Sequence, residues 1–141
     1  MKKDDLFLIG LDLVKDKAVL ERAYNDSQGV TAKFNLNVLS RINSELDSNF
    51  NINRFVHHAI YNESQNRVEI YLRSLENQIV NIPKARMMLQ IKQDELIHTE
   101  NSYKYSIAQF KKLTESSGFK TISVLSDKEN LFFPIFFFKH L

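Results

Sequence analysis

Apolar side chains recur at helical spacing in three parts of the chain. Residues 17–24 and 106–117 show short stretches of this kind, and Gly118 follows the second where a helix C-cap is expected. The longest stretch covers residues 30–46 and ends in the polar sequence 47–49, which favours a turn. Its apolar positions come every four residues, with one more that widens the stripe: Val30, Phe34, Val38, Ile42, Leu46 and Leu39.

Short apolar or alternating segments predict strands in the remaining chain. Leu6–Leu13 is almost continuously apolar, which is typical of a strand covered on both faces. Phe119–Leu125 and Leu131–Phe138 predict two closing strands joined by the polar turn Ser126–Asn130. The fold class is therefore expected to be α/β, or α+β within this stretch of chain. An antiparallel meander is expected from five middle segments: Phe55–Ile60, Arg67–Leu72, Ile79–Ile82, Met87–Ile91 and Leu96–Ser102.

Composition narrows the class of protein. The chain has 141 residues, 43% of them hydrophobic, which is enough for one soluble domain with a real core. Its net charge of +2 is small and its basic residues are scattered, so we expect no nucleic-acid partner. The apolar run 131–138 is far shorter than the roughly 20 residues that span a bilayer, and no signal peptide is apparent. The absence of cysteine excludes disulfides and thiolate chemistry and fits a cytoplasmic location.

The densest run of hydrogen-bonding side chains is 98–105. In a regular strand Glu100 and Ser102 share one face, with His98 and Lys104 in line with them. A carboxylate beside a hydroxyl can hold a small ligand with two polar hydrogens, such as an imidazole or an amine. Spacing alone leaves the alternative open that these residues belong to a solvated edge strand.

The four histidines do not predict a metal site. His57 and His58 are adjacent, so on a strand they point to opposite faces and cannot both ligate one ion. His98 and Glu100 could share a face, but a zinc site needs three or four ligands and no others can be identified.

Several segments, taken in order, resemble one known family. The chain is similar to the histidine-specific, S-adenosylmethionine-dependent methyltransferases that serve ergothioneine biosynthesis, and the likeness extends from about Leu6 to the C-terminus. The most specific combination is a helix entry of the form Gly-Val-Thr-x-x-Phe-Asn followed much later by Thr-Glu-x-Ser. The matching segments are residues 12–16, 23–26, 29–39, 67–70, 99–102 and 126–132.

The resemblance implies a domain organisation. In the family a Rossmann-like methyltransferase domain is interrupted by a substrate-binding domain. Residues 1–14 would be a strand of the methyltransferase sheet, 15–104 the substrate-binding domain, and 105–141 the return to the sheet. The two closing strands would be the antiparallel pair that ends such sheets.

The same resemblance implies roles for four residues in binding an amino-acid substrate. Glu100 and Ser102 would bind the imidazole of histidine, and the Tyr24 hydroxyl would reach its carboxylate. Ile70 occupies a position where the best-known member has a methionine that lines the pocket, and this departure argues against strict selectivity for histidine. Because the wider family includes relatives that methylate an indole nitrogen, another aromatic amino acid is the alternative substrate. No residue of this chain is predicted to be catalytic.

The cofactor is not expected to bind to this chain. Its glycines, Gly10, Gly29 and Gly118, are scattered singly, whereas a nucleotide cofactor on a Rossmann-type sheet needs a glycine-rich turn. S-adenosylmethionine would then be held by an N-terminal half absent from this sequence, separately encoded or lost. The chain would resemble the C-terminal part of an enzyme about twice as long and would be inactive alone. The alternative is a stand-alone amino-acid-binding or interaction module that has lost catalysis.

An apolar sheet face is expected to be exposed in the isolated chain, because the rest of the methyltransferase sheet would be missing. Patches of this kind promote self-association, so a homo-oligomer is a possible state. The residues expected on this face are Phe132, Phe133, Phe136, Phe137 and Phe138.

Overall fold

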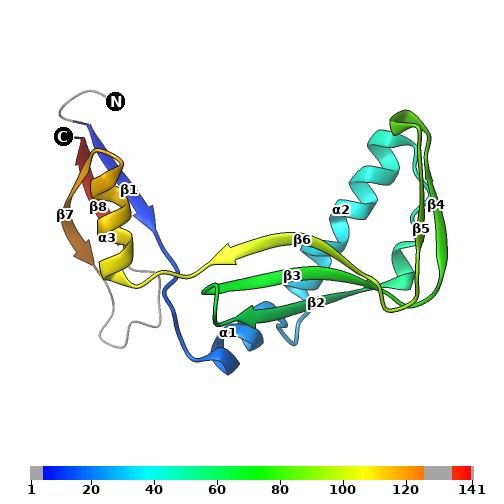
Figure 1. Ribbon diagram of the computed structural model, residues 1–141, viewed down its shortest axis with the longest axis horizontal. Helices are drawn as coiled ribbons and strands as arrows, with labels where there is room; N and C mark the ends of the chain where they lie inside the picture. Colours follow the sequence, from blue (N-terminus) through cyan, green and yellow to red (C-terminus); the bar gives the residue numbers. More distant parts are fainter. Residues whose placement is uncertain (1–4, 126–134, 141) are drawn as a thin grey trace. The chain divides into compact units, whose positions relative to one another are not determined.

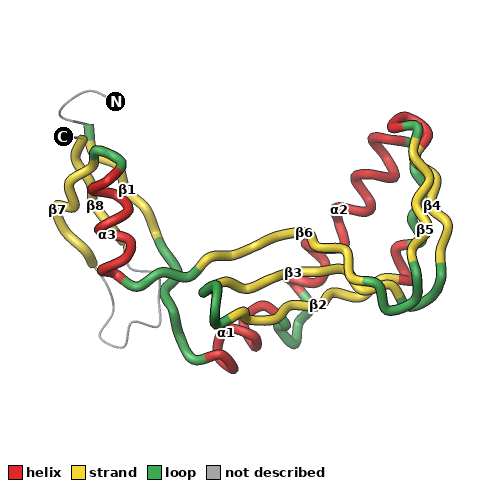
Figure 2. The backbone as a smooth tube through the Cα atoms, in the orientation of Figure 1, coloured by secondary structure: helices red, strands yellow, loops and turns green. Residues whose placement is uncertain are grey.

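The computed structural model describes residues 5–125 and 135–140, which fall into two compact units (Figure 1). The first unit is drawn from residues 1–16, 64–66 and 103–141, and the second from 17–63 and 67–102. Each unit combines helices with antiparallel strands, which Figure 2 shows by colour, and this agrees with the expected mixed class. No helix among the described residues is long and apolar enough to cross a membrane.

The second unit is built on a three-stranded sheet in the order β2 (Phe55–Asn62), β3 (Arg67–Ser74) and β6 (Leu96–Tyr103). Strands β2 and β3 are antiparallel, with Ala59 opposite Ile70. A separate antiparallel hairpin, β4 (Gln78–Ile82) and β5 (Met87–Ile91), is inserted between β3 and β6. All five predicted strands are therefore confirmed, but the meander is interrupted, because β6 pairs with β3 and not with β5.

Two helices cover one face of this sheet. Helix α1 (Lys17–Tyr24) contributes Leu20 to a core with Ala59 and Ile70, and α2 (Val30–Leu46) contributes Leu39 to a second core. We call this side the helix-covered face. A short 3₁₀ turn, η1 (Ile52–Arg54), lies between α2 and β2, and a second, η2 (Pro83–Ala85), connects β4 to β5. The second core contains Leu39, Phe50, Phe55, Leu72, Val80, Ile82 and Ile91.

Helix α2 forms where predicted but packs through a different face. Its most regular apolar positions are largely exposed, with Phe34 at 74% and Val30 at 62%. The buried positions are Asn35 and Leu39, one helical turn apart. The amide of Asn35 donates to the backbone carbonyl of Tyr71, and Leu39, with Leu36 and Ile42, packs on the core from the same side of α2.

The first unit is a three-stranded antiparallel sheet in the order β1 (Leu6–Gly10), β8 (Ile135–His140) and β7 (Phe119–Leu125). Helix α3 (Ile107–Ser116) begins in a capping box formed by Ser106 and Gln109, and Gly118 follows it with φ of +81°. The antiparallel pairing of the closing strands and the last predicted helix are thus confirmed, while residues 131–134 of the predicted strand Leu131–Phe138 lie outside the described residues. The predicted turn 126–130 lies outside the described residues.

Two expectations about apolar faces are wrong for the described residues. Strand β1 ends at Gly10 and is not covered on both faces, since Leu6 is 64% and Leu8 55% exposed. Phe138, expected on an exposed face, is completely buried against Phe110 because α3 packs over it. The other phenylalanines named for that face, or their side chains, lie outside the described residues.

A buried ion pair joins two segments of the first unit. The backbone N–H of Val14 donates to the carbonyl of Tyr105, and Leu13 and Tyr105 form a parallel bridge. Beside it, Nζ of Lys104, whose side chain is fully buried, lies 3.0 Å from a carboxylate oxygen of Asp12. Nζ of Lys15 lies 2.7 Å from the other oxygen. Burial raises the pKa of Asp12, but the hydrogen bonds and charges of the two lysines outweigh it and hold that pKa below its usual range.

Replacing Asp12 by Asn should destabilise the protein strongly, because it leaves the buried ammonium of Lys104 without its counter-charge. The loss of unfolding free energy in urea should reach about 3 kcal/mol or more, the cost of breaking a buried pair on one side. Glu45→Gln is the control, since its ion pair with Arg41 is exposed on both sides and should contribute less than about 1 kcal/mol. Equal effects of the two changes would contradict the structural role of Asp12.

Candidate functional site

The pairing of β6 with β3 includes one extra residue on β6. At one end the N–H of Ser74 donates to the carbonyl of Glu95, and at the other the N–H of Lys104 donates to the carbonyl of Asn66. Counting along a regular antiparallel ladder from the first pair would place Tyr103 opposite Asn66. The two bonds differ by one residue in register, from which we infer a β-bulge in β6.

The bulge lies between His98 and Asn101. Nε2 of His98 and Oδ1 of Asn101 are 2.9 Å apart, although residues three apart point to opposite faces of a regular strand. The His98 ring packs on Tyr71, with ring centroids 5.2 Å apart, on the face opposite Ile70. Past the bulge the alternation is inverted, so Glu100 lies on the helix-covered face.

Glu100 lines a depression of about 260 Å³ against α2, where its neighbours include Asn35, Asn37 and Thr99. The prediction that His98 is in line with Glu100 and Ser102 is therefore wrong, because the bulge separates them. Lys104 does not join this face either, because its ammonium is buried on Asp12.

Tyr24 and Ser102, predicted from residues far apart in sequence, are in direct contact. The Tyr24 hydroxyl at the end of α1 lies 2.7 Å from the Ser102 hydroxyl on β6. Both side chains are half-buried, and the tyrosine ring packs on the core formed by Leu20, Ala59 and Ile70. The structure thus brings three predicted residues, Tyr24, Ser102 and Ile70, into one neighbourhood.

Ile70 lies deeper than the other three residues. It is 4% exposed and packs between Val68 and Ala59 in the core beneath Tyr24. Its side chain therefore supports Tyr24 from the core and contributes little to the exposed surface. Its role as a pocket wall stays a prediction.

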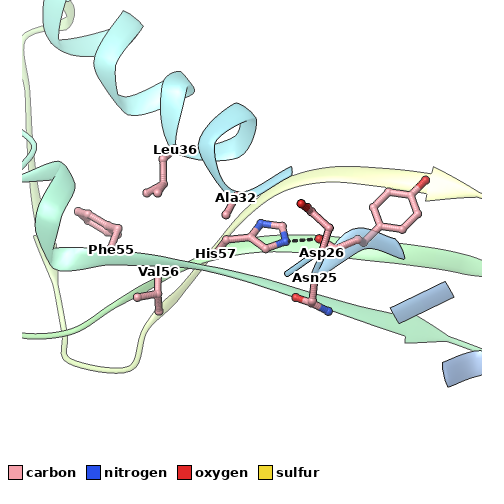
Figure 3. A pocket seen from close by; sticks show the side chains of 8 residues that line it. Asn25, Asp26, Ala32, Leu36, Phe55, Val56 and His57 are labelled. Carbon is pink, nitrogen blue, oxygen red and sulfur yellow. Dashed lines mark hydrogen bonds between the residues drawn. The ribbon is translucent and has the colours of Figure 1, made fainter. Parts of the chain in front are cut away.

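A second depression, of about 370 Å³, lies between the end of α1, the start of α2 and β2 (Figure 3). Its walls include apolar side chains of Leu36, Phe55 and Val56, with Asp26 and His57 as polar neighbours. The Asp26 carboxylate accepts hydrogen bonds from the backbone N–H groups of Thr31 and Val30, which lower the pKa of Asp26 to about 2.

The face of the sheet opposite the helices carries a charge network. The Glu69 carboxylate accepts hydrogen bonds from the Tyr71 hydroxyl at 2.7 Å, from Arg67 at 2.8 Å and from Asn62 at 2.9 Å. These bonds lower the pKa of Glu69 to about 2, and the bond from Tyr71 has the largest effect. The bond to Glu69 raises the pKa of Tyr71. The network ties β2 to β3 on the side away from the predicted substrate residues.

Gly29 and Gly118 lie at single helix ends and form no glycine-rich turn of the kind that holds a nucleotide cofactor. Gly29, with φ of +66°, precedes α2, but the first N–H groups of that helix are already bonded to Asp26 and cannot cradle a charged ligand group. Gly118 follows α3 and has no other glycine near it in the sequence. Within residues 5–125 and 135–140 no group of three potential metal ligands comes together. His57 and His58 point to opposite faces, as expected, since His57 bonds Asn35 and His58 packs near Tyr71.

Sequence reasoning missed the residues that hold the site together. Asn35 is 7% exposed and His57 half-buried, and both make hydrogen bonds at the helix-covered face. The signal available in the sequence was the polar side chain of Asn35 next to apolar Phe34 on an amphipathic helix, and it indicates no particular chemistry.

Comparison with known proteins identifies the family. The model of the histidine-specific, S-adenosylmethionine-dependent methyltransferases matches residues 1–138, so the chain belongs to this family. It is 42% identical over 105 residues to the histidine N-alpha-methyltransferase of Mycobacterium tuberculosis and 39% identical to that of Mycolicibacterium smegmatis. Each match covers 74% of this chain and 33% of the relative. An ergothioneine biosynthesis protein of Schizosaccharomyces pombe is 30% identical over 120 residues, 84% of this chain and 15% of the relative. The chain thus spans about a third of the length of its bacterial relatives.

A double-mutant cycle can test the contact between Tyr24 and Ser102 in the chain itself. Tyr24→Phe and Ser102→Ala should each lower the free energy of unfolding by about 1 kcal/mol, the usual contribution of one hydrogen bond. The double variant should lose clearly less than the sum, because both changes remove the same bond. Ser102→Ala combined with Glu115→Gln, an exposed residue of α3, should be additive. Additivity of the Tyr24 and Ser102 changes would contradict the contact.

Acid should destabilise the fold between about pH 4.5 and pH 2. The carboxyls of Asp26 and Glu69 have folded-state pKa values near 2, below the ordinary 3.8 and 4.5, so their stabilising bonds are fully present above pH 4.5. As the pH falls through this range the unfolded state binds more protons, and the midpoint of thermal unfolding should fall. In the double variant Asp26→Asn, Glu69→Gln the decline should be shallower than in the wild type. An unfolding midpoint that is constant or rises with acid would contradict this assignment.

Proposed function

We propose that this chain supplies the substrate-recognising part of an S-adenosylmethionine-dependent histidine Nα-methyltransferase. The observation that carries the proposal is that Tyr24 and Ser102 are hydrogen-bonded at 2.7 Å in a chain of this family, with Glu100 on the same face of the sheet. These three residues are the polar groups expected to bind histidine.

In this proposal the Glu100 carboxylate accepts the hydrogen bond of the imidazole N–H, and Ser102 binds the ring beside it. Tyr24 directs its hydroxyl to the substrate carboxylate. The contact between Tyr24 and Ser102 would orient both hydroxyls before the substrate enters, which lowers the entropic cost of binding. Ile70 supports the apolar side of the pocket from the core.

Catalysis in such an enzyme is largely a matter of position. Methyl transfer needs an unprotonated amine in line with the methyl group of the cofactor, so a pocket that fixes the amino acid supplies much of the rate. We propose that residues 15–104 form the substrate-binding domain, while 1–14 and 105–141 belong to a Rossmann-like methyltransferase domain. The cofactor would be bound mainly by a part of the enzyme that these 141 residues do not include, since the matches cover 33% of the bacterial relatives. On this proposal the residues described here do not methylate histidine by themselves.

The proposal can be tested in a chimera in which this chain replaces the matching segment of the Mycobacterium tuberculosis relative. Glu100→Ala should weaken histidine binding by about 1.5–3 kcal/mol, because it removes a charged acceptor of the ring N–H. The loss should be greater for histidine than for an amino acid without a ring N–H, since that analogue leaves no donor unpaired. Ser102→Ala should act in the same direction but more weakly, as a neutral hydroxyl contributes less than a carboxylate.

Glu115→Ala is the matched control, because it removes an exposed carboxylate on α3. It should leave binding unchanged in calorimetric titration and in methyl-transfer kinetics. If Glu100→Ala methylates histidine with unaltered kinetics, the carboxylate belongs to a solvated strand and the assignment of the pocket is wrong.

A further inference from the structure

The hydrogen bonds of His57 define the state of its ring. Its Nε2 lies 2.8 Å from the backbone carbonyl of Tyr24, and its Nδ1 lies 3.1 Å from Nδ2 of Asn35 (Figure 3 marks the first bond by a dashed line). A carbonyl can only accept, so Nε2 carries the hydrogen. The amide nitrogen of Asn35 can only donate, so Nδ1 accepts, and the ring is the neutral Nε2–H tautomer.

The orientation of the Asn35 amide is fixed independently. The same Nδ2 lies 3.0 Å from the carbonyl of Tyr71, so each of its two hydrogens has an acceptor. A flipped amide would place its oxygen against the Tyr71 carbonyl and leave two acceptors facing each other. A connected path of hydrogen bonds therefore runs from β3 through α2 and β2 to the end of α1.

Tyr24 is the last residue of α1, where backbone carbonyls lack partners within the helix. His57 supplies a donor to one of them. The next residue, Asn25, bonds Ala59 on β2 through both its amide nitrogen and its oxygen. The end of α1 is thus attached to β2 twice, through the carbonyl of Tyr24 and through the side chain of Asn25. The Tyr24 hydroxyl, in turn, contacts Ser102.

We propose that His57, held by Asn35, is a positioning residue for Tyr24 in the substrate pocket. The inference rests on the proposed function of Tyr24 as the ligand of the substrate carboxylate. His57 itself bonds the backbone of Tyr24 and acts through it, by fixing where the phenolic hydroxyl lies. A small displacement of a group that binds the substrate weakens binding, because such groups must lie within about 0.5 Å of the productive position.

The first experiment uses the chain as it is and needs no substrate. The coupling between Tyr24→Phe and Ser102→Ala is measured in the wild type and in a His57→Phe background, by urea unfolding. Loss of the donor to the Tyr24 carbonyl should abolish the coupling. His57→Gln, which can still donate to that carbonyl, should restore most of it. His58→Phe is the matched control, since the neighbouring histidine lies on the other face, and should leave the coupling unchanged.

The second experiment uses the active chimera described above. His57→Phe should raise KM for histidine about tenfold with kcat altered less than about threefold, the pattern expected when binding shared by the ground state and the transition state is lost. His57→Gln should lie near the wild type. Undiminished coupling in His57→Phe, or a failure of His57→Gln to restore it, would overturn the proposal. A third outcome is that the Tyr24–Ser102 coupling depends on His57 but Glu100→Ala does not change histidine binding. His57 would then still position Tyr24, and the proposed substrate pocket would be wrong.

Nitrogen NMR of the wild-type chain keeps the proposal testable if His57→Phe does not fold. Long-range ¹H–¹⁵N correlations of the histidine rings should show the Nε2–H tautomer for His57 near neutral pH. The Nδ1–H tautomer would place a donor against the Asn35 amide and leave the Tyr24 carbonyl without its partner, and would overturn the proposal.

Discussion

The arrangement of the second unit depends on the hydrogen bonds that the buried side-chain amide of Asn35 must make. Asn35 is 7% exposed, and an unpaired amide at that depth would cost a free energy comparable to a lost hydrogen bond. Its nitrogen bonds the backbone of β3 and the ring of His57, and that ring bonds the end of α1. Rotating α2 to bury its apolar stripe would break these bonds and would also remove Leu39 from the core. The amide bonds and the packing of Leu39 together leave Phe34 in solvent.

A second constraint acts through the strand that carries the site. One extra residue on β6 separates His98 from Glu100 and sends them to opposite faces. Because side chains alternate in a strand, a change of one residue in register moves every later side chain to the other face. The bulge therefore leaves Glu100 and Ser102 on the face that carries Tyr24, while His98 packs on Tyr71. Bulges of this kind are common beside functional sites, where they redirect side chains.

The two faces of the sheet consequently have different chemistry. The helix-covered face has hydroxyls, an amide and one carboxylate close to an apolar core, which suits a small ligand with a few polar hydrogens. On the opposite face, Glu69 is saturated with hydrogen bonds from three neighbours and stabilises the pairing of β2 with β3. Similar residue types thus stabilise strand pairing on one side and, in the proposed function, bind the substrate on the other.

The sequence by itself determined the number, type and order of the elements, and it identified the family. Helical and strand periods are local properties, so 17–24, 30–46 and the five middle strands could be predicted closely. Strand spacing indicated Glu100 and Ser102 as a possible site, whereas Tyr24 and Ile70 came from the resemblance alone, and periodicity could not have singled out Tyr24. The tertiary structure decided which face of α2 is buried, where β6 is bulged, and that Lys104 is bound to Asp12. Those outcomes depend on hydrogen-bond partners far away along the chain, which a local pattern does not contain.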